Sequence, residues 1–534
     1  MDKIFRKLDF SRPKVENERI IYLWILALIA FSFSLPRYSL RISEFILLIF
    51  WVFSSSFRQK LACLKQNHGM LILASFFIAY LIGVLNTPSF PENLIYLRKI
   101  LPWLGLALFI GSYSGLEKKA LNQLLIIYIA GVLLHTLASY ATFHGMPWGK
   151  IEDFRNLDLY PNFSHHRFVL SIDLAIFFLA YLIYQYWHEI NRKIKIAGVL
   201  TLFWLIYYLF FSKIITGIFI FGLFAFIVPL YFFIKSKGIL RYLSLSFMLI
   251  LILVVGFSMY QLYAGFWLVE KPDRQALPEK TENGNPYQHR MELDDIENGH
   301  FTWLYLNEAE MQKEWNERSD IKYNDKAAND YLLKYSLIRY LTSLGLTKDS
   351  AGVSQLDQSD IRAIEKGIAN HRYKKFDLKD RFYTTAWELY HAYDKDTPLG
   401  TLTGRLFSYE HGFQIFLEQP VIGHGVRSLE KVFRKHYDNR GLTSPYYVPA
   451  HNQYLRFLIE FGILGLLWFL LSVFLPFIRE KGYRYFLLNS IIAMIMIACF
   501  INNTLKSQWS LSFLVFFYGI FYTSLVKKDE PLIH

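Results

Sequence analysis

The sequence predicts an all-α, polytopic membrane protein with about twelve transmembrane helices and one large helical loop domain. Composition is the first observation: 53% of the 534 residues are hydrophobic and only 19% are charged, whereas soluble domains carry about a quarter charged residues. The second is the grouping of apolar residues into blocks of about 16–25, the length that a helix needs to cross a hydrocarbon core of about 30 Å. We therefore expect an N-terminal membrane region (1–265), a loop domain (266–452) and a C-terminal membrane region (453–534).

The apolar blocks give the candidate spans in chain order. The first follows a polar, basic N-terminus without a small-residue cleavage site, so we expect an uncleaved span and not a signal peptide. The closely spaced seventh and eighth spans predict a tight turn at Ser212-Lys213. The candidate spans cover residues 20–36, 42–57, 70–86, 100–114, 121–142, 168–187, 196–211, 214–234, 242–265, 453–478, 485–502 and 510–526.

The distribution of Lys and Arg predicts the orientation. Twelve spans place both termini on one side, and the segments on that side carry 22 Lys and Arg against 9 in the short opposite loops. Because cytoplasmic loops carry the excess of these residues, we expect cytoplasmic termini in a bacterial inner membrane and a periplasmic loop domain. This bias also accounts for most of the +13 net charge, so no nucleic-acid partner is needed to explain it.

The loop domain contains helix signals and no strong strand alternation. Polar caps, broad apolar faces and terminating Gly or Pro residues mark four helices. They are a helix capped by Asn324-Asp325 that ends at Gly345, a helix capped by Ser359-Asp360 that covers 361–369, and helices over 403–418 and 428–439.

The densest group of polar residues lies at the exit of the loop, around His451, Asn452 and Tyr454. His451 stands at the start of the tenth span, where a neutral imidazole can accept a proton from a sugar hydroxyl. The alternative is that this histidine only caps the helix, which is the commoner role for such a position. Further along the span, Arg456 and Glu460 are four residues apart on a face that points away from His451, so we expect them to pair with each other.

Several cations recur at the predicted external ends of spans. Each alone is typical of an interfacial anchor, but together they can bind a diphosphate, whose oxygens match the guanidinium fork. Asp173, two turns into the sixth span, is an intramembrane carboxylate that either has a function or pairs with a nearby cation. The cations in question are Arg98, Lys99, Arg167, Lys213 and Arg405.

No metal or cofactor is expected. His165 and His166 resemble a metal pair, but the nearby carboxylates lack ligand spacing. The sequence contains no phosphate-binding GxxxxGK[ST] loop, no HExxH, no GxSxG and no Rossmann glycine set.

The stretches "GRLFSYEHGFQIFLEQPVIGHG" and "HNQYLRFLIEFGILGLL" resemble the signature of the O-antigen ligase and polymerase superfamily. The resemblance implies a GT-C-type membrane fold and a transferase independent of metal and nucleotide. Its donor would be an undecaprenyl-diphosphate-linked glycan, and the acceptor of a ligase would be lipid A–core. His451 would act as the base and Arg405 would hold the diphosphate. Lys213 stands where the family usually has an arginine, which keeps the charge without the fork, so Arg167 can share the phosphate binding.

The resemblance leaves the acceptor open. A single displacement at the anomeric carbon would invert its configuration, whichever hydroxyl attacks. The size of the loop favours a ligase, whereas a polysaccharide polymerase or a protein O-oligosaccharyltransferase would use the same donor. A transporter for the lipid-linked glycan is a further alternative, but it predicts charged midplane residues and broken helices in paired halves.

Overall fold

The computed structural model describes residues 14–85, 90–146, 165–374, 378–391, 401–442 and 450–527. The chain divides into two compact units, one of residues 1–225 with 404–534 and one of residues 226–403. We call them the membrane unit and the loop unit. The division predicted at residues 265 and 452 concerns the boundary of the membrane, and it stays a prediction.

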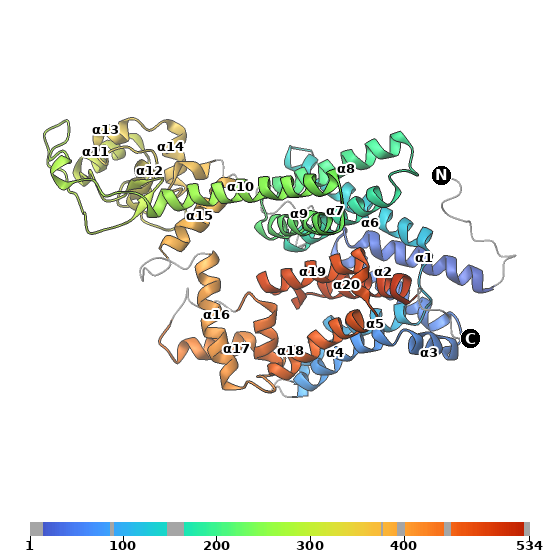
Figure 1. Ribbon diagram of the computed structural model, residues 1–534. Coiled ribbons are helices and arrows are strands. Elements are labelled where there is room, and N and C mark those ends of the chain that lie inside the picture. The colour runs from blue at the N-terminus through green and yellow to red at the C-terminus, as the bar shows by residue number, and fades with distance from the viewer. Residues whose placement is uncertain are drawn as a thin grey trace. The chain divides into compact units, whose positions relative to one another are not determined.

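Helices make up the membrane unit (Figure 1). Two of them, α9 and α16, continue across the boundary between the units. They are α1 (Lys14–Ser32), α2 (Arg37–Phe53), α3 (Phe57–Gln66), α4 (His68–Leu85), α5 (Phe90–Gly111), α6 (Lys118–Phe143), α7 (His165–Tyr186), α8 (Arg192–Phe211), α9 (Ile215–Lys235), α16 (Thr401–Glu418), α17 (Leu429–Asp438), α18 (Gln453–Arg479), α19 (Phe486–Ile501) and α20 (Gln508–Phe521), with short turns η4 (Gly482–Arg484), η5 (Thr504–Lys506) and η6 (Tyr522–Val526).

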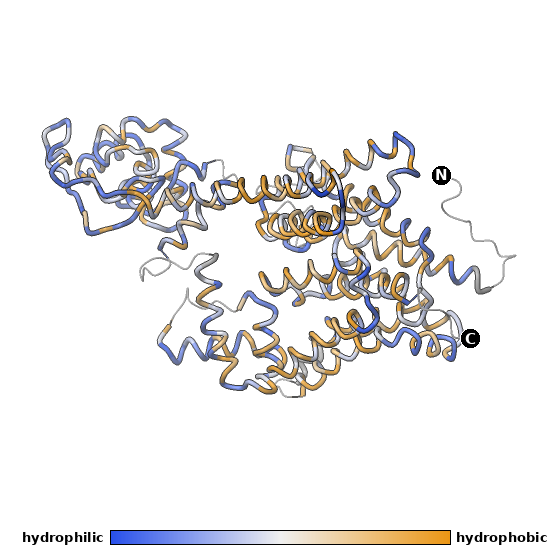
Figure 2. The backbone as a smooth tube through the Cα atoms, in the orientation of Figure 1, coloured by the Kyte–Doolittle hydropathy of each residue, from blue (hydrophilic) through white to orange (hydrophobic). Residues whose placement is uncertain are grey.

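The helices confirm an all-α protein with several apolar spans. Among the described residues eight helices are long and apolar enough to cross a membrane, or nine if the bent pair α2 and α3 forms one span. Each of the twelve predicted spans coincides with a helix, but length and composition do not confirm the number twelve. The second predicted span, 42–57, ends early because the chain bends by 114° between α2 and α3. Figure 2 shows the hydrophobic colour along the long helices.

Aromatic side chains form the core of the membrane unit. Phe33, directly after α1, lies at ring distances of 5.7 and 5.2 Å from Trp509 and Phe513 of α20, and Phe76 of α4 lies 5.4 Å from Phe457 of α18. The apolar window of α20 is accordingly 94% buried, whereas that of α8 is 17% buried. An apolar helix that its neighbours leave uncovered needs lipid around it, so α8 is a peripheral helix of a membrane bundle.

Helix α18 is broken at Gly462, whose backbone has φ +67° and ψ −170°. The segment 420–425 fills the break: Ile463 N donates to Pro420 O at 2.8 Å, and Gly425 N donates to Glu460 O at 3.0 Å. A Cβ atom at Gly462 would lie 2.1 Å from Val421 O. The close contact at Gly462 is therefore made with a loop. The same contact explains the Pro-x-x-Gly-x-Gly spacing of residues 420–425, because this segment packs against the break in α18.

The loop unit consists of one long helix and a set of short ones. Its strands within the described residues form a single two-residue antiparallel pair that aligns Ile296 with Phe301. The elements are α10 (Ile239–Trp267), η2 (Arg274–Ala276), β1 (Ile296–Glu297), β2 (His300–Phe301), α11 (Glu308–Arg318), α12 (Leu333–Ser343), α13 (Ser350–Ser354), α14 (Gln358–Glu365), η3 (His371–Lys374) and α15 (Leu378–Tyr390).

Two predicted helix starts are wrong, whereas the helices over 401–418 and 429–438 are confirmed. The helix capped by Asn324-Asp325 begins only at Leu333, because the preceding residues form a turn in which Leu333 N donates to Asp325 O at 2.9 Å. Asp357, and not Ser359, caps α14, since Asp357 and Asp360 exchange side-chain to backbone hydrogen bonds at 2.7 and 3.0 Å.

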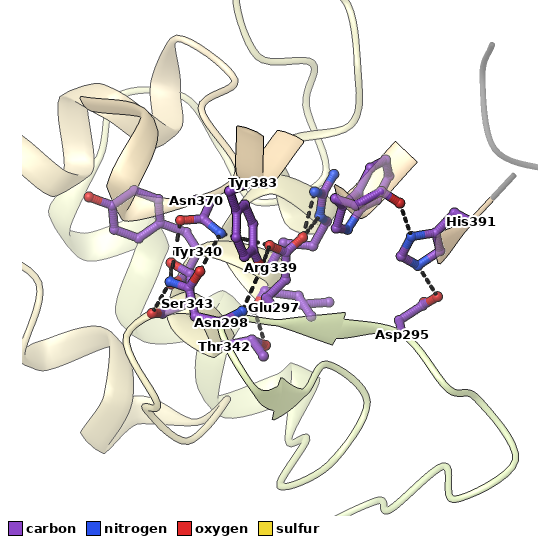
Figure 3. Close-up of polar contacts among 12 residues, drawn as sticks. Asp295, Glu297, Asn298, Arg339, Tyr340, Thr342, Ser343, Asn370, Tyr383 and His391 are labelled. Carbon is purple, nitrogen blue, oxygen red and sulfur yellow. Dashed lines mark hydrogen bonds and ion pairs between the residues drawn. The ribbon is translucent and has the colours of Figure 1, made fainter. Parts of the chain in front are cut away.

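A closed polar network lies in the loop unit around Glu297 (Figure 3). This carboxylate is 1% exposed and accepts hydrogen bonds from Arg339 Nε at 2.6 Å and from Asn370 Nδ2 at 2.7 Å. The guanidinium of Arg339 lies 4.4 Å from the centre of the Trp387 ring. Nearby, His391 Nε2 lies 3.1 Å from Asp295 Oδ1. We call residues 297, 339 and 370 the Glu297 network; its charges are satisfied within the protein.

Candidate active site

A cavity of about 350 Å³ opens inside the membrane unit. Its walls come from the first turns of α2, α7, α9 and α17, from Lys99 in the middle of α5, from His451, and from the turn between α19 and α20 with the adjoining ends of these two helices. These segments are far apart in the sequence, yet the predicted topology places each of them at the external side. Packing therefore gathers the external ends of several helices around one space.

The charge of the cavity wall is predominantly positive. Among the described residues, Arg41, Lys99, Arg167 and Lys506 line it, together with one carboxylate, that of Glu430. His166 and His451 also contribute to the wall. Lys506 lies 3.8 Å from Glu430, and both side chains are more than half exposed, so this contact neutralises little of the charge. Such a surface attracts a multiply charged anion.

His451 lies in this wall and does not cap a helix. Asn452 is the cap of α18, because its Oδ1 accepts hydrogen bonds from Tyr454 N at 2.9 Å and from Leu455 N at 3.1 Å. Burial lowers the pKa of His451; a hydrogen bond with the Asn502 side chain acts against this, and the charges of Arg405 and Lys506 lower the pKa further. The imidazole is therefore neutral near pH 7, as a general base requires.

Arg405 lies near His451 without lining the cavity. It sits on α16, and its charge acts on His451 and on Tyr409, one turn further along the helix. Tyr409 Oη donates to His451 O at 3.4 Å. A buried cluster that includes Ile415, Phe433 and Ala450 packs α16, α17 and the start of α18 together, so Arg405 and His451 are held by one small core.

The other predicted residues are spread over the membrane unit. Arg167, in the first turn of α7, lines the cavity. Arg98 is exposed, and its neighbour Lys99 lines the wall instead. Lys213 forms the predicted tight turn with φ +53°, three residues before Thr216, which lines the wall.

Tyr454 and Asp173 point elsewhere. Tyr454 Oη donates to Met496 O at 2.9 Å, which fastens α18 to α19. Asp173 is fully buried in α7, and within the described part of the chain neither of its carboxylate oxygens has a hydrogen-bond partner. The alternative that Asp173 pairs with a nearby cation such as Arg167 is therefore not supported by a hydrogen bond among the described residues.

The pairing predicted between Arg456 and Glu460 is confirmed. Arg456 Nη2 lies 2.8 Å from Glu460 Oε1, and Arg456 Nε lies 3.0 Å from Oε2. Glu460 Oε1 also accepts a hydrogen bond from Arg427 N at 3.2 Å. The pair thus fastens the loop before α17 to the broken helix, which is a structural role.

Five further residues of the wall were not predicted as residues of one site: Arg41, His166, Glu430, Asn502 and Lys506. Four of them lie at predicted external ends of spans, which was the available signal, whereas Glu430 lies within the predicted loop domain. The signal does not say which of the helix ends are neighbours, so it cannot separate these residues from other interfacial ones.

Within the described residues no group of three or more His, Cys, Asp or Glu side chains can hold a metal ion. His166 lines the cavity, whereas the side chain of His165 lies outside the described part. Independence from metal remains a prediction.

A family model described as O-antigen ligase matches residues 358–470. This region runs from α14 into the second half of α18 and contains Arg405, His451 and the Arg456–Glu460 pair. No curated protein matches the sequence.

Proposed function

Since the chain belongs to the O-antigen ligase superfamily, we propose that it is a membrane glycosyltransferase that moves a glycan from undecaprenyl diphosphate to a sugar hydroxyl of lipid A–core. The observation that carries the proposal is the cavity, in which a neutral histidine faces the same space as four cationic side chains. A transferase with a diphosphate leaving group needs these two elements: a base for the attacking hydroxyl and positive charge for the departing oxygens.

In the proposed reaction the acceptor hydroxyl oxygen attacks the anomeric carbon of the lipid-linked sugar. His451 takes the hydroxyl proton as the new C–O bond forms. The bond between the anomeric carbon and the diphosphate oxygen breaks, and the negative charge stays on undecaprenyl diphosphate. A single displacement of this kind inverts the anomeric configuration.

The cations have two proposed roles. Arg167 and Lys99 line the cavity and bind the diphosphate oxygens directly, which lowers the energy of the charge that develops there. Arg405 acts beside His451, where its charge favours the neutral imidazole and it can reach a phosphate of the bound donor. Lys213 and Arg98, which lie outside the cavity wall, are proposed to contact the donor at its margins.

Asn452, Tyr454 and Asp173 have accessory roles in this proposal. Asn452 and Tyr454 hold the first turn of α18 and with it His451. Asp173 lies six residues after Arg167 on the same helix, α7.

The site is proposed to face the periplasm in a bacterial inner membrane, in a fold of the GT-C type. The segments that form the cavity wall are the ones that the Lys and Arg distribution assigns to the external side. Their convergence supports the assignment of these segments to one side of the membrane, and the Lys and Arg bias is the reason for proposing that this side is periplasmic.

The experiment is transfer by the purified protein in proteoliposomes that contain undecaprenyl-diphosphate glycan and lipid A–core, without nucleotide and with a metal chelator. The wild type should attach glycan to lipid A–core. His451→Ala should lose about 10²- to 10⁴-fold of the rate, the usual contribution of a general base. His188→Ala is the matched control, since His188 is exposed in the turn before α8.

Other products would identify the alternatives. Longer glycans that stay on undecaprenyl diphosphate would indicate a polymerase, and glycan on Ser or Thr of an added protein would indicate a protein O-oligosaccharyltransferase. Folded wild-type protein that transfers glycan to no acceptor would contradict the proposed function and favour a transporter.

A further inference from the structure

The turn between α19 and α20 contributes more of the cavity wall than any helix end, and it lies outside the matched region 358–470. We call residues 502–508 the distal turn. It contains η5 and separates two apolar helices, so hydropathy alone would treat it as a connection. Six of its seven residues line the cavity: Asn502, Asn503, Thr504, Lys506, Ser507 and Gln508.

The distal turn is fastened to the backbone on both sides of His451. Asn503 Nδ2 donates to Ala450 O at 2.5 Å, and Leu505 N donates to Gln453 Oε1 at 3.0 Å. These two hydrogen bonds bracket the catalytic residue. The position of the turn and the position of His451 are therefore coupled.

Asn502 lies in the cavity wall together with His451, and a hydrogen bond with its side chain favours the protonated imidazole. The amide is itself held, because Asn502 Oδ1 accepts a hydrogen bond from Asn503 N at 3.0 Å. An amide oxygen that accepts the N–H of an imidazole fixes the proton on that ring nitrogen and leaves the lone pair on the other one. Orientation of this kind is what a base needs if its second nitrogen is to face an acceptor hydroxyl.

Gln508, at the other end of the turn, holds a cation of the wall. Arg41 Nε donates to Gln508 Oε1 at 3.0 Å, and Gln508 Nε2 donates to Glu44 Oε2 at 2.8 Å. An amide is suited to this place because it accepts from the cation with one atom and donates to the carboxylate with the other. Arg41 lines the cavity and contacts Gln508 through Nε, so the two terminal nitrogens are the atoms that we expect to bind a phosphate.

We propose that the distal turn is the positioning element of the site: Asn502 orients His451 toward the acceptor hydroxyl, and Gln508 orients Arg41 toward a phosphate of the donor. The proposal rests on the proposed function for the identity of donor and acceptor. It assigns positioning roles to two residues, and it adds Arg41 to those that bind the donor.

The test of Asn502 is the pH profile of transfer by Asn502→Ala and Asn502→Asp. Loss of the amide should lower kcat about tenfold or more and move the acid limb to lower pH, because the bond to Asn502 favours the protonated ring. A carboxylate favours it more, so Asn502→Asp should move the limb to higher pH by about one unit. Asn489→Ala, at the opposite end of α19, should change neither quantity.

The test of Gln508 is a double-mutant cycle with Arg41. Gln508→Leu should raise the KM for the donor several-fold with little change in kcat, and it should have no further effect in an Arg41→Ala background. Equal effects of Gln508→Leu in both backgrounds would overturn this half of the proposal. If the acid limb of the pH profile stays at the wild-type pH in both Asn502 variants, the positioning role of Asn502 is overturned.

Imidazole NMR distinguishes failure of this inference from failure of the proposed function. In protein labelled with ¹⁵N-histidine, the His451 signals are those absent from His451→Gln, and their titration needs no substrate. If the wild type transfers no glycan but Asn502→Asp raises the pKa of His451, the positioning contact stands and the proposed function fails. If the wild type transfers glycan but the titration of His451 is the same in all Asn502 variants, the positioning role is contradicted.

Discussion

The Glu297 network of the loop unit and the cavity of the membrane unit both gather charged side chains, but they balance them differently. Around Glu297 the carboxylate receives a guanidinium and an amide, and it is almost fully buried. Around the cavity the described residues contribute four cations and one carboxylate to the wall. A balanced, buried cluster holds a fold together, whereas an excess of one sign around open space suits a ligand of opposite charge.

The two ion pairs Arg339–Glu297 and Arg456–Glu460 belong to the first kind. Each guanidinium contacts its carboxylate within 3.0 Å, and each pair ties together segments far apart in the sequence. A strongly charged residue in a buried place is thus not by itself a sign of a functional site. The sign is the imbalance of charge at the wall of a cavity.

The largest effect should come from breaking the balanced cluster. Arg339→Ala leaves the buried Glu297 carboxylate without its cation, which should destabilise the loop unit by about 3–5 kcal/mol. Limited proteolysis of the purified protein should then cut within residues 266–391 at a lower temperature. Arg362→Ala, an exposed arginine of α14, is the control, and equal protection of the two variants would contradict the structural role of the network.

The next largest effect should come from Gly462. Gly462→Ala forces a residue with a Cβ into φ +67° and against Val421 O, which should cost about 1–3 kcal/mol or more. Thermal unfolding in detergent measures this cost. Gly222→Ala in α9 is the matched control, because a Cβ there meets nothing within 4 Å; a similar melting temperature for both variants would show that the break in α18 is not needed.

A smaller effect is expected from a single cation of the cavity wall. Arg167→Ala should raise the KM for the lipid-linked donor about tenfold, since a charged hydrogen bond contributes about 1.5–3 kcal/mol, while the melting temperature should stay unchanged. Arg192→Ala, at the start of α8 on the predicted cytoplasmic side, should change neither. A loss of stability without a change in the KM for the donor would show that Arg167 has a structural role, as Arg339 and Arg456 do.

The smallest expected effect is that of mild acid. It should reduce glycan transfer at the cavity and leave the loop unit folded. Transfer should be constant near pH 7 and fall as the pH drops through the lowered pKa of His451, below its usual 6.5, because only the neutral ring accepts a proton. Burial raises the pKa of Glu310 in the loop unit, but hydrogen bonds from Thr281, Asn285, Ser350 and Asn283 outweigh it and bring the pKa to about 2.

A carboxyl group with a lowered pKa stabilises the fold above its unfolded pKa and loses this effect only as the pH falls through the folded value. The contribution of Glu310 should therefore persist at the pH where protonation of His451 reduces transfer. Circular dichroism and transfer measured over pH 5–8 compare the two. Unfolding that accompanies the loss of transfer would contradict the assignment of the acid limb to His451.

Local properties of the sequence predicted a large part of this protein. Apolar blocks gave a helix at each of the twelve expected spans, and caps and terminators gave two of the four loop helices within about two residues. The other two starts were wrong because a backbone turn before Leu333 and the pair Asp357–Asp360 competed with the expected caps. The motif around residues 404–465 indicated the family that the match supports.

What the sequence determined by itself is what depends on neighbours along the chain: helices, their approximate ends, the bias of Lys and Arg, and the Arg456–Glu460 pair one turn apart. Only the tertiary structure decided which helix ends meet. Packing places Lys99, and not Arg98, in the cavity wall, together with Arg41, the distal turn and His451. It also packs the segment 420–425 against Gly462. The physical reason is that a cavity is formed by side chains whose proximity comes from long-range packing, and one sequence does not encode that proximity in any local pattern.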